Sequence, residues 1–332
     1  MTISRPKWFS NDTVMVSTAP TCGLSKGGRL LPIVDPVSGK RIQIIDPETG
    51  GNVDAINDQL LKDAVALSEG ALTETLAFIP RDRVSLRCAV PTYFDSRPTN
   101  RFREAMTEPC FKGFTSASIG ELVTRNLISI RGGHGSPSQD QRIGDVPYIK
   151  VSDLRAGLVN INPTNRIPSS VAKQFWKANS SDLRPFDLVC PERTSKNIGD
   201  FCVLMPGQER VVLTKEIIVV RPGDAAYFDP FYLLWALTLK IVRDQWRRVI
   251  FMQTNREDVG KRYLEIEIPV PPDSQQAASV SQAFRTYYES IAESRSALID
   301  YLRADNSHHF FVAGAEAEIL SGPPEDVIQV TK

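Results

Sequence analysis

The residues best suited to chemistry in this sequence are basic and amide side chains gathered between Lys240 and Arg262. This stretch holds seven basic and three acidic residues, interleaved with aromatic side chains. Arginine and lysine can bind phosphates or guanine edges, and glutamine and asparagine can pair with adenine. A second polar loop, from Arg193 to Gly199, has the same chemistry. We predict that both segments contact DNA, with a solvated polar loop as the alternative for each.

Two further places add to the predicted DNA contacts. One is a glycine-rich loop from Arg131 to Pro137, which we expect to be mobile, and the other is the extended segment that ends near Lys150. The full set of predicted DNA-binding residues is Arg131, His134, Lys150, Arg193, Ser195, Lys196, Asn197, Gln253, Asn255, Arg256, Lys261 and Arg262.

The sequence offers little for catalysis. Methyltransferases that act on exocyclic amines take the base out of the helix and hold it with a Pro-Pro-aromatic motif. The nearest string, Asp229 to Tyr232, has phenylalanine in place of the second proline and reads as a helix start. The glycine-rich loop at 131–135 lacks the Gly-x-Gly-x-x-Gly spacing of dinucleotide-binding proteins. The chain has only three histidines and its carboxylates are scattered, which favours neither a metal centre nor a nuclease. We predict no catalytic residue, metal or cofactor in this chain.

Charge is unevenly distributed along the chain, although the formal net charge is zero. Residues 1–111 hold 13 basic and 13 acidic groups, residues 112–262 hold 22 and 15, and residues 263–332 hold 4 and 11. The three differences are 0, +7 and −7. A surface with excess positive charge attracts the phosphate backbone of nucleic acids, so the middle segment is the candidate for binding DNA.

Length and composition indicate a globular protein. A chain of 332 residues is long enough for two domains. Its five cysteines form no close pairs, which is typical of a reducing compartment. The most apolar run, residues 231–242, is shorter than the roughly 20 residues that a membrane helix needs. We therefore expect a soluble, cytoplasmic protein without membrane contact.

The pattern of elements predicts an α+β fold in four segments. Residues 1–110 form a small α/β N-terminal domain, with two Asp-Pro-x-x-Gly turns that suggest a hairpin and a helix over 54–68. Residues 111–272 form a mixed-sheet domain of short strands with one amphipathic helix over 229–243. Residues 273–305 form a long helix, and residues 306–332 form an acidic tail.

The long helix carries apolar residues at alternating steps of four and three, which is the seam spacing of a coiled coil. Because about three heptads are short for an independent coiled coil, we expect the seam to pack on a partner chain or on the helix's own domain. A plain amphipathic surface helix is the alternative. The predicted docking residues are Val280, Phe284, Tyr287, Ile291, Leu298 and Tyr301.

The middle of the chain resembles the target-recognition domains of type I restriction-modification specificity subunits. The resemblance lies in the order of several loose motifs over about 160 residues, continued by the long helix. These motifs are Gly144–Gly157, Phe186–Val189, Arg193–Gly199, Phe228–Trp235, Gln253–Lys261 and Leu264–Pro272.

This resemblance implies a domain that reads part of a DNA target and a helix that docks a methyltransferase. The expected partners are double-stranded DNA and an adenine DNA methyltransferase, which would bind S-adenosylmethionine. Specificity subunits of this family have two recognition domains and this chain has one, so a second copy of the chain is a further candidate partner. Residues 22–29 and the turns after them also resemble the tail of an adenine methyltransferase domain.

The leading hypothesis is a DNA specificity subunit of a restriction-modification or phage-defence system. One alternative is a complete methyltransferase or nuclease with an unfamiliar centre, or the C-terminal part of such an enzyme, as in a split or fused adenine DNA methyltransferase. Another is a non-catalytic assembly scaffold whose working surface is the acidic C-terminal helix.

Overall fold

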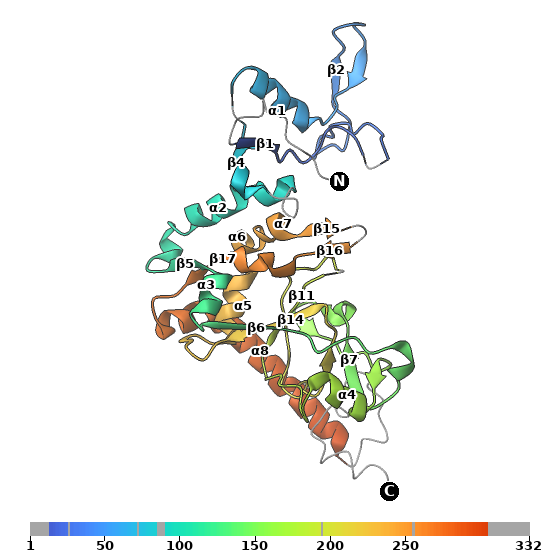
Figure 1. The fold of residues 1–332 in the computed structure, drawn as a ribbon, viewed down its shortest axis with the longest axis vertical. Helices are drawn as coiled ribbons and strands as arrows, with labels where there is room; N and C mark the ends of the chain where they lie inside the picture. The colour runs from blue at the N-terminus through green and yellow to red at the C-terminus, as the bar shows by residue number, and fades with distance from the viewer. Residues whose placement is uncertain are drawn as a thin grey trace. The chain divides into compact units, whose positions relative to one another are not determined.

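The computed structural model describes residues 13–25, 27–71, 73–84, 90–193, 195–253 and 256–304, except the side chains of 252–257. It divides into two compact units, Met1–Arg97 and Pro98–Lys332, called here the N-terminal and C-terminal units (Figure 1). Among the helices of these residues, none combines the length and the apolar character needed to span a membrane.

The N-terminal unit is built from short strands and one helix. Two of its strands, β1 and β4, pair antiparallel from Thr13 opposite Pro80 to Ser17 opposite Leu76. The other two, β2 and β3, form a hairpin. Its elements are β1 (Thr13–Ser17), β2 (Gln43–Ile45), β3 (Asn52–Asp54), α1 (Gln59–Ser68), β4 (Leu76–Pro80) and the 3-10 helices η1 (Arg81–Arg83) and η2 (Pro91–Phe94).

Both Asp-Pro-x-x-Gly phrases form the predicted turns, the second joining β2 to β3 and the first closing an isolated bridge between Val34 and Arg41. The glycine nitrogen donates to the aspartate carbonyl oxygen at 2.9 Å in the first turn, Asp35 to Gly39, and at 2.8 Å in the second, Asp46 to Gly50. Each aspartate carboxylate also accepts a hydrogen bond from the backbone two residues on. The helix after these turns starts at Gln59, later than predicted, because Asp58 caps it.

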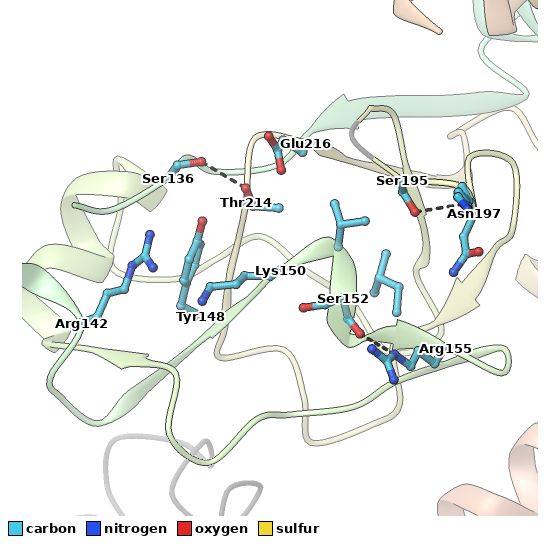
Figure 2. A pocket seen from close by; sticks show the side chains of 13 residues that line it. Ser136, Arg142, Tyr148, Lys150, Ser152, Arg155, Ser195, Asn197, Thr214 and Glu216 are labelled. Atoms are coloured by element: carbon cyan, nitrogen blue, oxygen red, sulfur yellow. Dashed lines mark hydrogen bonds between the residues drawn. The ribbon is translucent and has the colours of Figure 1, made fainter. Parts of the chain in front are cut away.

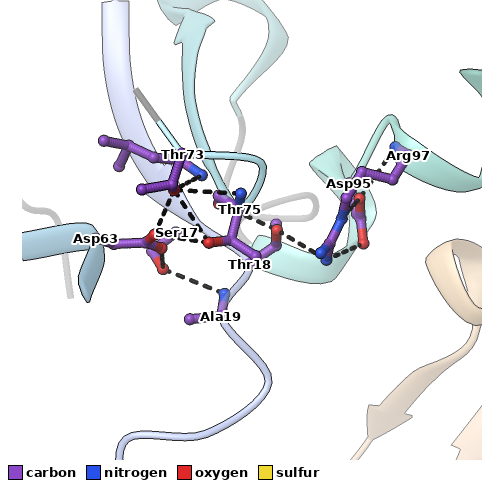
Figure 3. A network of polar contacts seen from close by, with 9 residues as sticks. Ser17, Thr18, Ala19, Asp63, Thr73, Thr75, Asp95 and Arg97 are labelled. Atoms are coloured by element: carbon purple, nitrogen blue, oxygen red, sulfur yellow. Dashed lines mark hydrogen bonds and ion pairs between the residues drawn. The ribbon is translucent and has the colours of Figure 1, made fainter. Parts of the chain in front are cut away.

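A buried carboxylate joins the strands and helix of the N-terminal unit. Asp63 of α1 is 2% exposed and accepts hydrogen bonds from the hydroxyls of Ser17, Thr73 and Thr75 (Figure 3). The apolar core beside it is small, consisting of Val16, Ile79 and Phe94 with a few half-buried neighbours. Hydrogen bonds to Asp63 therefore contribute much of what ties this unit together.

The C-terminal unit is a mixed α/β structure with several sheets and a long last helix. Its first part contains α2 (Arg97–Ala105), η3 (Pro109–Phe111), β5 (Thr115–Ser118), α3 (Ile119–Thr124), β6 (Ile128–Gly132), η4 (Gln139–Gln141), β7 (Val146–Ile149), η5 (Val151–Asp153), β8 (Leu154–Arg155), β9 (Leu158–Val159), β10 (Arg166–Ile167) and α4 (Ser169–Trp176). The remainder contains β11 (Leu188–Pro191), β12 (Cys202–Val203), β13 (Val212–Leu213), β14 (Ile217–Pro222), α5 (Pro230–Thr238), α6 (Lys240–Arg243), α7 (Trp246–Val249), β15 (Phe251–Gln253), β16 (Arg256–Asp258), η6 (Gly260–Glu265), β17 (Glu267–Val270) and α8 (Ser274–Arg303).

Two sheets form the centre of this unit. The larger has six strands in the order β6-β14-β11-β12-β9-β8, antiparallel throughout except between β12 and β9. The smaller has the order β10-β7-β13, with β7 antiparallel to β10 and parallel to β13. Further two-stranded ladders join β17 to β5 and β15 to β16.

Alternating side chains fix the layers around these sheets. In β14, Ile218 and Val220 lie in the cluster formed with the helices, whereas Ile217 and Val219 lie in the cluster shared with the smaller sheet. Successive side chains of a strand point to opposite faces, so the larger sheet buries both. Helix α4 covers the outer face of the smaller sheet, and Tyr148 of β7 packs in the cluster between them.

The predicted amphipathic helix over 229–243 is wrong in two respects. Its start is correct, since the Asp229 side chain accepts a hydrogen bond from the Tyr232 nitrogen and Pro230 follows the cap. However, Leu239 has an extended ψ of 132°, which separates α5 from α6. In addition, α5 is buried on most sides because it lies between the larger sheet and α8, so its residues are apolar nearly all round.

The long helix α8 forms as predicted, with Asp273 as its cap. Val280, Phe284 and Ile291 of the predicted seam pack on the core of the C-terminal unit, whereas Tyr287, Leu298 and Tyr301 are about half exposed, at 55%, 45% and 50%. One side of the helix therefore packs on its own domain and a neighbouring stripe stays accessible.

The predicted domain boundary at residue 110 and the division of the compact units differ in position. The units divide after Arg97, so most of α2 belongs to the C-terminal unit. Phe102 of α2 is fully buried in the core cluster of that unit, and Arg103 pairs with Glu267. The sequence of α2 gives little sign of this packing, because only Pro98 and Phe102 of the helix are buried and the rest is mostly polar.

Replacing Asp63 with alanine should lower the free energy of unfolding of the N-terminal unit by about 1–3 kcal/mol, since three hydroxyls lose their shared acceptor. Burial raises the pKa of Asp63, but the three hydroxyls and the charge of Arg97 lower it more, leaving the pKa below its ordinary value of 3.8. The carboxylate therefore stabilises the unit above pH 3.8, and this contribution is lost as the pH falls through the folded-state pKa.

Hydrogen exchange of β1 and β4 in the full chain measures this effect. At neutral pH, the amide hydrogens of β1 and β4 should exchange faster in Asp63→Asn than in the unmodified chain. This difference in exchange rate should shrink below pH 3.8. The exposed Asp82→Asn variant is the matched control. Equal exchange in Asp63→Asn and Asp82→Asn at neutral pH would contradict the role given to Asp63.

Candidate nucleic-acid interface

A concave pocket of about 710 Å³ lies where the loop before β7, the turn after β7, the turn before β12 and the turn between β13 and β14 come together (Figure 2). Most of its lining side chains are polar or charged. They are Ser136, Arg142, Tyr148, Lys150, Val151, Ser152, Leu154, Arg155, Ser195, Lys196, Asn197, Thr214 and Glu216.

Strand β7 positions one end of the pocket. Its Tyr148 is 3% exposed and anchored in the cluster with α4. The charged groups of Arg142 and Lys150 lie 5.6 Å and 6.0 Å from the centre of the Tyr148 ring. A cation over an aromatic ring is attracted to it, so the buried ring helps to hold both cations at this end.

A buried carboxylate shapes the turn that follows Lys150. The backbone nitrogen of Lys150 donates to Asp153 Oδ2 at 2.7 Å, and Asp153 is 9% exposed. Burial raises the pKa of Asp153, against the effect of this hydrogen bond. Beyond the turn, Arg155 Nε donates to the Ser152 carbonyl oxygen at 2.8 Å. These bonds fix the backbone that carries Lys150, Ser152 and Arg155.

The opposite end of the pocket is the turn over 195–200. The Asn197 nitrogen donates to Ser195 Oγ at 3.0 Å, and fully buried Ile198 anchors the turn from below. Gly199 has a φ of +87°, and a Cβ atom there would lie 2.7 Å from the buried ring of Trp246. Glycine is therefore required at this position, both for its backbone conformation and for the close approach of the ring.

The pocket gathers cations that have no acidic partner. Among the described residues, no carboxylate oxygen lies within 4.0 Å of the charged nitrogens of Arg142, Lys150, Arg155 or Lys196. Arg142 Nε is also buried without a hydrogen-bond partner. Glu216 is the one acidic residue in the lining. Four cations against one carboxylate make the pocket electropositive.

The structure brings together four of the predicted DNA-binding residues, namely Lys150, Ser195, Lys196 and Asn197, which all line this pocket. Lys261 is exposed on η6 but does not line it. The predictions for Gln253, Asn255 and Arg256 lie outside the described side chains.

Arg193 and Arg262 have partners within the protein. Arg193 lies 3.7 Å from Glu192 and 3.9 Å from Asp258. Arg262 donates to the carbonyl oxygens of Val249 and Asp258, each at 2.9 Å, and lies 3.8 Å from the Phe251 ring centre. Because these contacts hold the β15–β16 hairpin to its surroundings, we leave both arginines out of the candidate surface.

The loop that carries Arg131 and His134 is bonded to the rest of the protein. The His134 and Gly135 nitrogens donate to the Leu213 carbonyl oxygen at 2.9 Å and 3.1 Å. Arg131 Nη2 and His134 Nε2 both bond the carbonyl oxygen of Ser181, at 3.0 Å and 2.8 Å. The loop is thus fastened along the edge of the smaller sheet, and DNA contact by these two side chains stays a prediction.

Nine of the thirteen residues that line the pocket were not predicted, and the functionally important ones among them are Arg142, Tyr148, Arg155 and Glu216. Tyr148 and Arg155 lie within the Gly144–Gly157 phrase, so that phrase was the available signal. Nothing in the sequence distinguishes Arg142 or Glu216 from other surface charges, since only folding places them beside the others. Within the described part of the chain, no three His, Cys, Asp or Glu side chains gather to hold a metal.

The histidine in the fastened loop yields a pH prediction. Because the Leu213 backbone nitrogen donates to His134 Nδ1 at 3.0 Å, the ring proton must reside on Nε2. Burial is the main reason that the pKa of His134 is lowered from 6.5 to about 4. The neutral ring therefore stabilises the fold above pH 6.5, and the stabilisation declines as the pH falls from 6.5 towards 4.

NMR titration of the ring should give a pKa near 4 for the resonance that disappears in His134→Gln. The variant should also lose less stability than the unmodified chain between pH 6.5 and 5. A His134 resonance that titrates near 6.5 would contradict the buried, neutral ring.

Comparisons with known proteins identify no matching family model and no matching curated protein. Among solved structures, the chain is similar to the S subunit of a type I restriction-modification system from M. genitalium, at 14% identity and a TM-score of 0.38, over 59% of this chain and 44% of the other. It is also similar to the HsdS subunit of Thermoanaerobacter tengcongensis, at 15% identity and a TM-score of 0.34, over 68% and 50%.

A third similar structure concerns complex assembly and conformational transition of the type I restriction-modification system, at 16% identity and a TM-score of 0.35, over 84% and 76%. The chain spans about half the length of the two subunits above, at 44% and 50%. At such TM-scores the likeness supports no residue's role, and the roles rest on the contacts of this chain. These three solved structures come from type I restriction-modification systems.

Proposed function

We propose that the C-terminal unit recognises a specific DNA sequence through the pocket and directs a partner adenine DNA methyltransferase to it. The observation that carries this proposal is the group of four cations, Arg142, Lys150, Arg155 and Lys196, without an acidic partner among the described residues. Other arginines nearby, such as Arg210 and Arg221, pair with carboxylates of the protein. Cations left without such partners are available to phosphates.

The pocket also contains the groups that reading a sequence requires. Phosphate contacts position a protein on DNA, whereas hydrogen bonds to base edges distinguish sequences. Ser195 and Asn197 stand beside the cations, and an asparagine side chain can pair with adenine through two hydrogen bonds. A pocket with both kinds of group suits specific binding better than a uniformly basic surface does.

In this proposal the chain is a non-catalytic subunit of a methylation complex, in a restriction or phage-defence system. S-adenosylmethionine binds to the partner. The single recognition domain reads one part of a target, and a second copy of the chain supplies the other part where the target is split.

Replacing Lys150 or Lys196 with alanine should weaken binding to all duplexes similarly and reduce the slope of log affinity against log salt by about 1 each. The physical reason is that each variant releases fewer counterions from the DNA. A salt series with and without the methyltransferase measures both quantities. Lys173→Ala on α4 is the matched control, since Lys173 is exposed and does not line the pocket.

The same measurement separates the alternatives. Unchanged slopes in both pocket variants would overturn the proposed site. Absence of DNA binding with and without the partner would favour the scaffold, and methyl transfer or cleavage by the purified chain alone would favour an enzyme.

Docking of the partner is proposed for the exposed stripe of α8, formed by Tyr287, Leu298 and Tyr301. Leu298→Glu should weaken binding of the methyltransferase about tenfold or more, because a charge would replace an apolar side chain that the bound partner buries. Ser296→Glu, also exposed on α8, adds the same charge off the stripe and should bind normally. The measurement is the affinity of each variant for the purified methyltransferase. Equal affinities of Leu298→Glu and Ser296→Glu would place the docking surface elsewhere.

A further inference from the structure

Glu216 is the one carboxylate among the side chains that line the pocket (Figure 2). It stands in the turn just before β14, where its carbonyl oxygen accepts a hydrogen bond from the Glu192 nitrogen at 2.8 Å. Its side chain is half-buried. Among the described residues, no hydrogen-bond donor or cation is bonded to its carboxylate. The turn is thus fixed while the carboxylate remains available.

A carboxylate in this position argues against a pocket that binds only the phosphates of DNA. It repels phosphate, and the four cations of the pocket lie too far away to form ion pairs with it. If the pocket bound only the DNA backbone, Glu216 would weaken that binding without benefit. Its position makes sense where the ligand brings a hydrogen-bond donor of its own.

The bases of DNA differ in the donors that they present. In the major groove, guanine and thymine offer acceptors, which a carboxylate repels. Adenine offers an amine beside the N7 acceptor, whereas cytosine offers its N4 amine with no acceptor at its side. Of the four base edges, cytosine therefore complements a carboxylate best.

We propose that Glu216 is a specificity-determining residue that accepts a hydrogen bond from the N4 amine of a cytosine in the DNA target. This inference rests on the proposed function of the pocket. The cations at Arg142 and Lys150 hold the neighbouring backbone, and Glu216 rejects base edges that carry only acceptors.

Selection of bound duplexes from a randomised library, with the full chain and its partner, tests the assignment. The unmodified chain should enrich cytosine at one position, and Glu216→Gln should reduce that preference about tenfold, since a good base contact contributes about 1–3 kcal/mol. Asp224→Asn removes the same charge from an exposed position outside the pocket and should keep the preference.

A second measurement isolates the hydrogen bond. The selected cytosine is replaced by the 2-pyrimidinone nucleoside, which is cytosine without its amine. This replacement should weaken DNA binding by the unmodified chain about tenfold. It should leave DNA binding by Glu216→Gln nearly unchanged, as expected when the two groups interact directly.

The outcomes distinguish the inference from the proposed function. If the unmodified chain enriches no base at any position, the proposed function fails. If it enriches bases and Glu216→Gln retains every preference, or loses a preference for a base other than cytosine, the assignment of Glu216 is overturned while the proposed function stands.

Discussion

Burial of both faces of the six-stranded sheet is the constraint on which the C-terminal unit depends. Val189 of β11 lies in the cluster shared with the smaller sheet, whereas Leu188 and Cys190 lie in the cluster with the helices. Because both faces are packed, most side chains within these strands are apolar, and most polar groups lie in the connecting turns. The pocket is formed largely by such turns, so a change in its polar side chains leaves the packed layers beneath it in place.

The basic residues fall into two groups, those that pair with carboxylates of the protein and those that do not. Arg221 is 8% exposed and lies 2.6 Å from Asp187, and burial raises the pKa of that aspartate against the effect of the arginine. Breaking such a pair by removing one member leaves an uncompensated buried charge. Lys150 and Lys196 have no such partner among the described residues. Counting charges in the sequence does not distinguish basic residues that pair within the protein from those that are available to DNA.

The sequence predicted the elements that have a strong local pattern. β11 and β14 are continuous apolar runs, and α8 has a cap and a regular repeat, so all three were found. The β8–β9 hairpin and β10 were missed because their two-residue strands lie among turn residues, whereas the equally short β12 and β13 lie in apolar runs and were found. Nine of the thirteen residues that line the pocket were missed for another reason. Arg142 and Glu216 are ordinary surface charges in the sequence, and only the tertiary fold places them beside Lys150.

A direct contact joins the pocket to the long helix. Tyr288 of α8 donates from its hydroxyl to the Gly157 carbonyl oxygen at 3.2 Å, and Gly157 follows the strand that carries Arg155. Gly157 has a φ of +76°, and a Cβ atom there would lie 2.6 Å from the Tyr288 hydroxyl. Tyr287 directly precedes Tyr288 on α8 and is exposed. A partner bound on the exposed stripe would therefore contact the same packed body that carries the pocket, which would fix its catalytic site relative to the bound DNA.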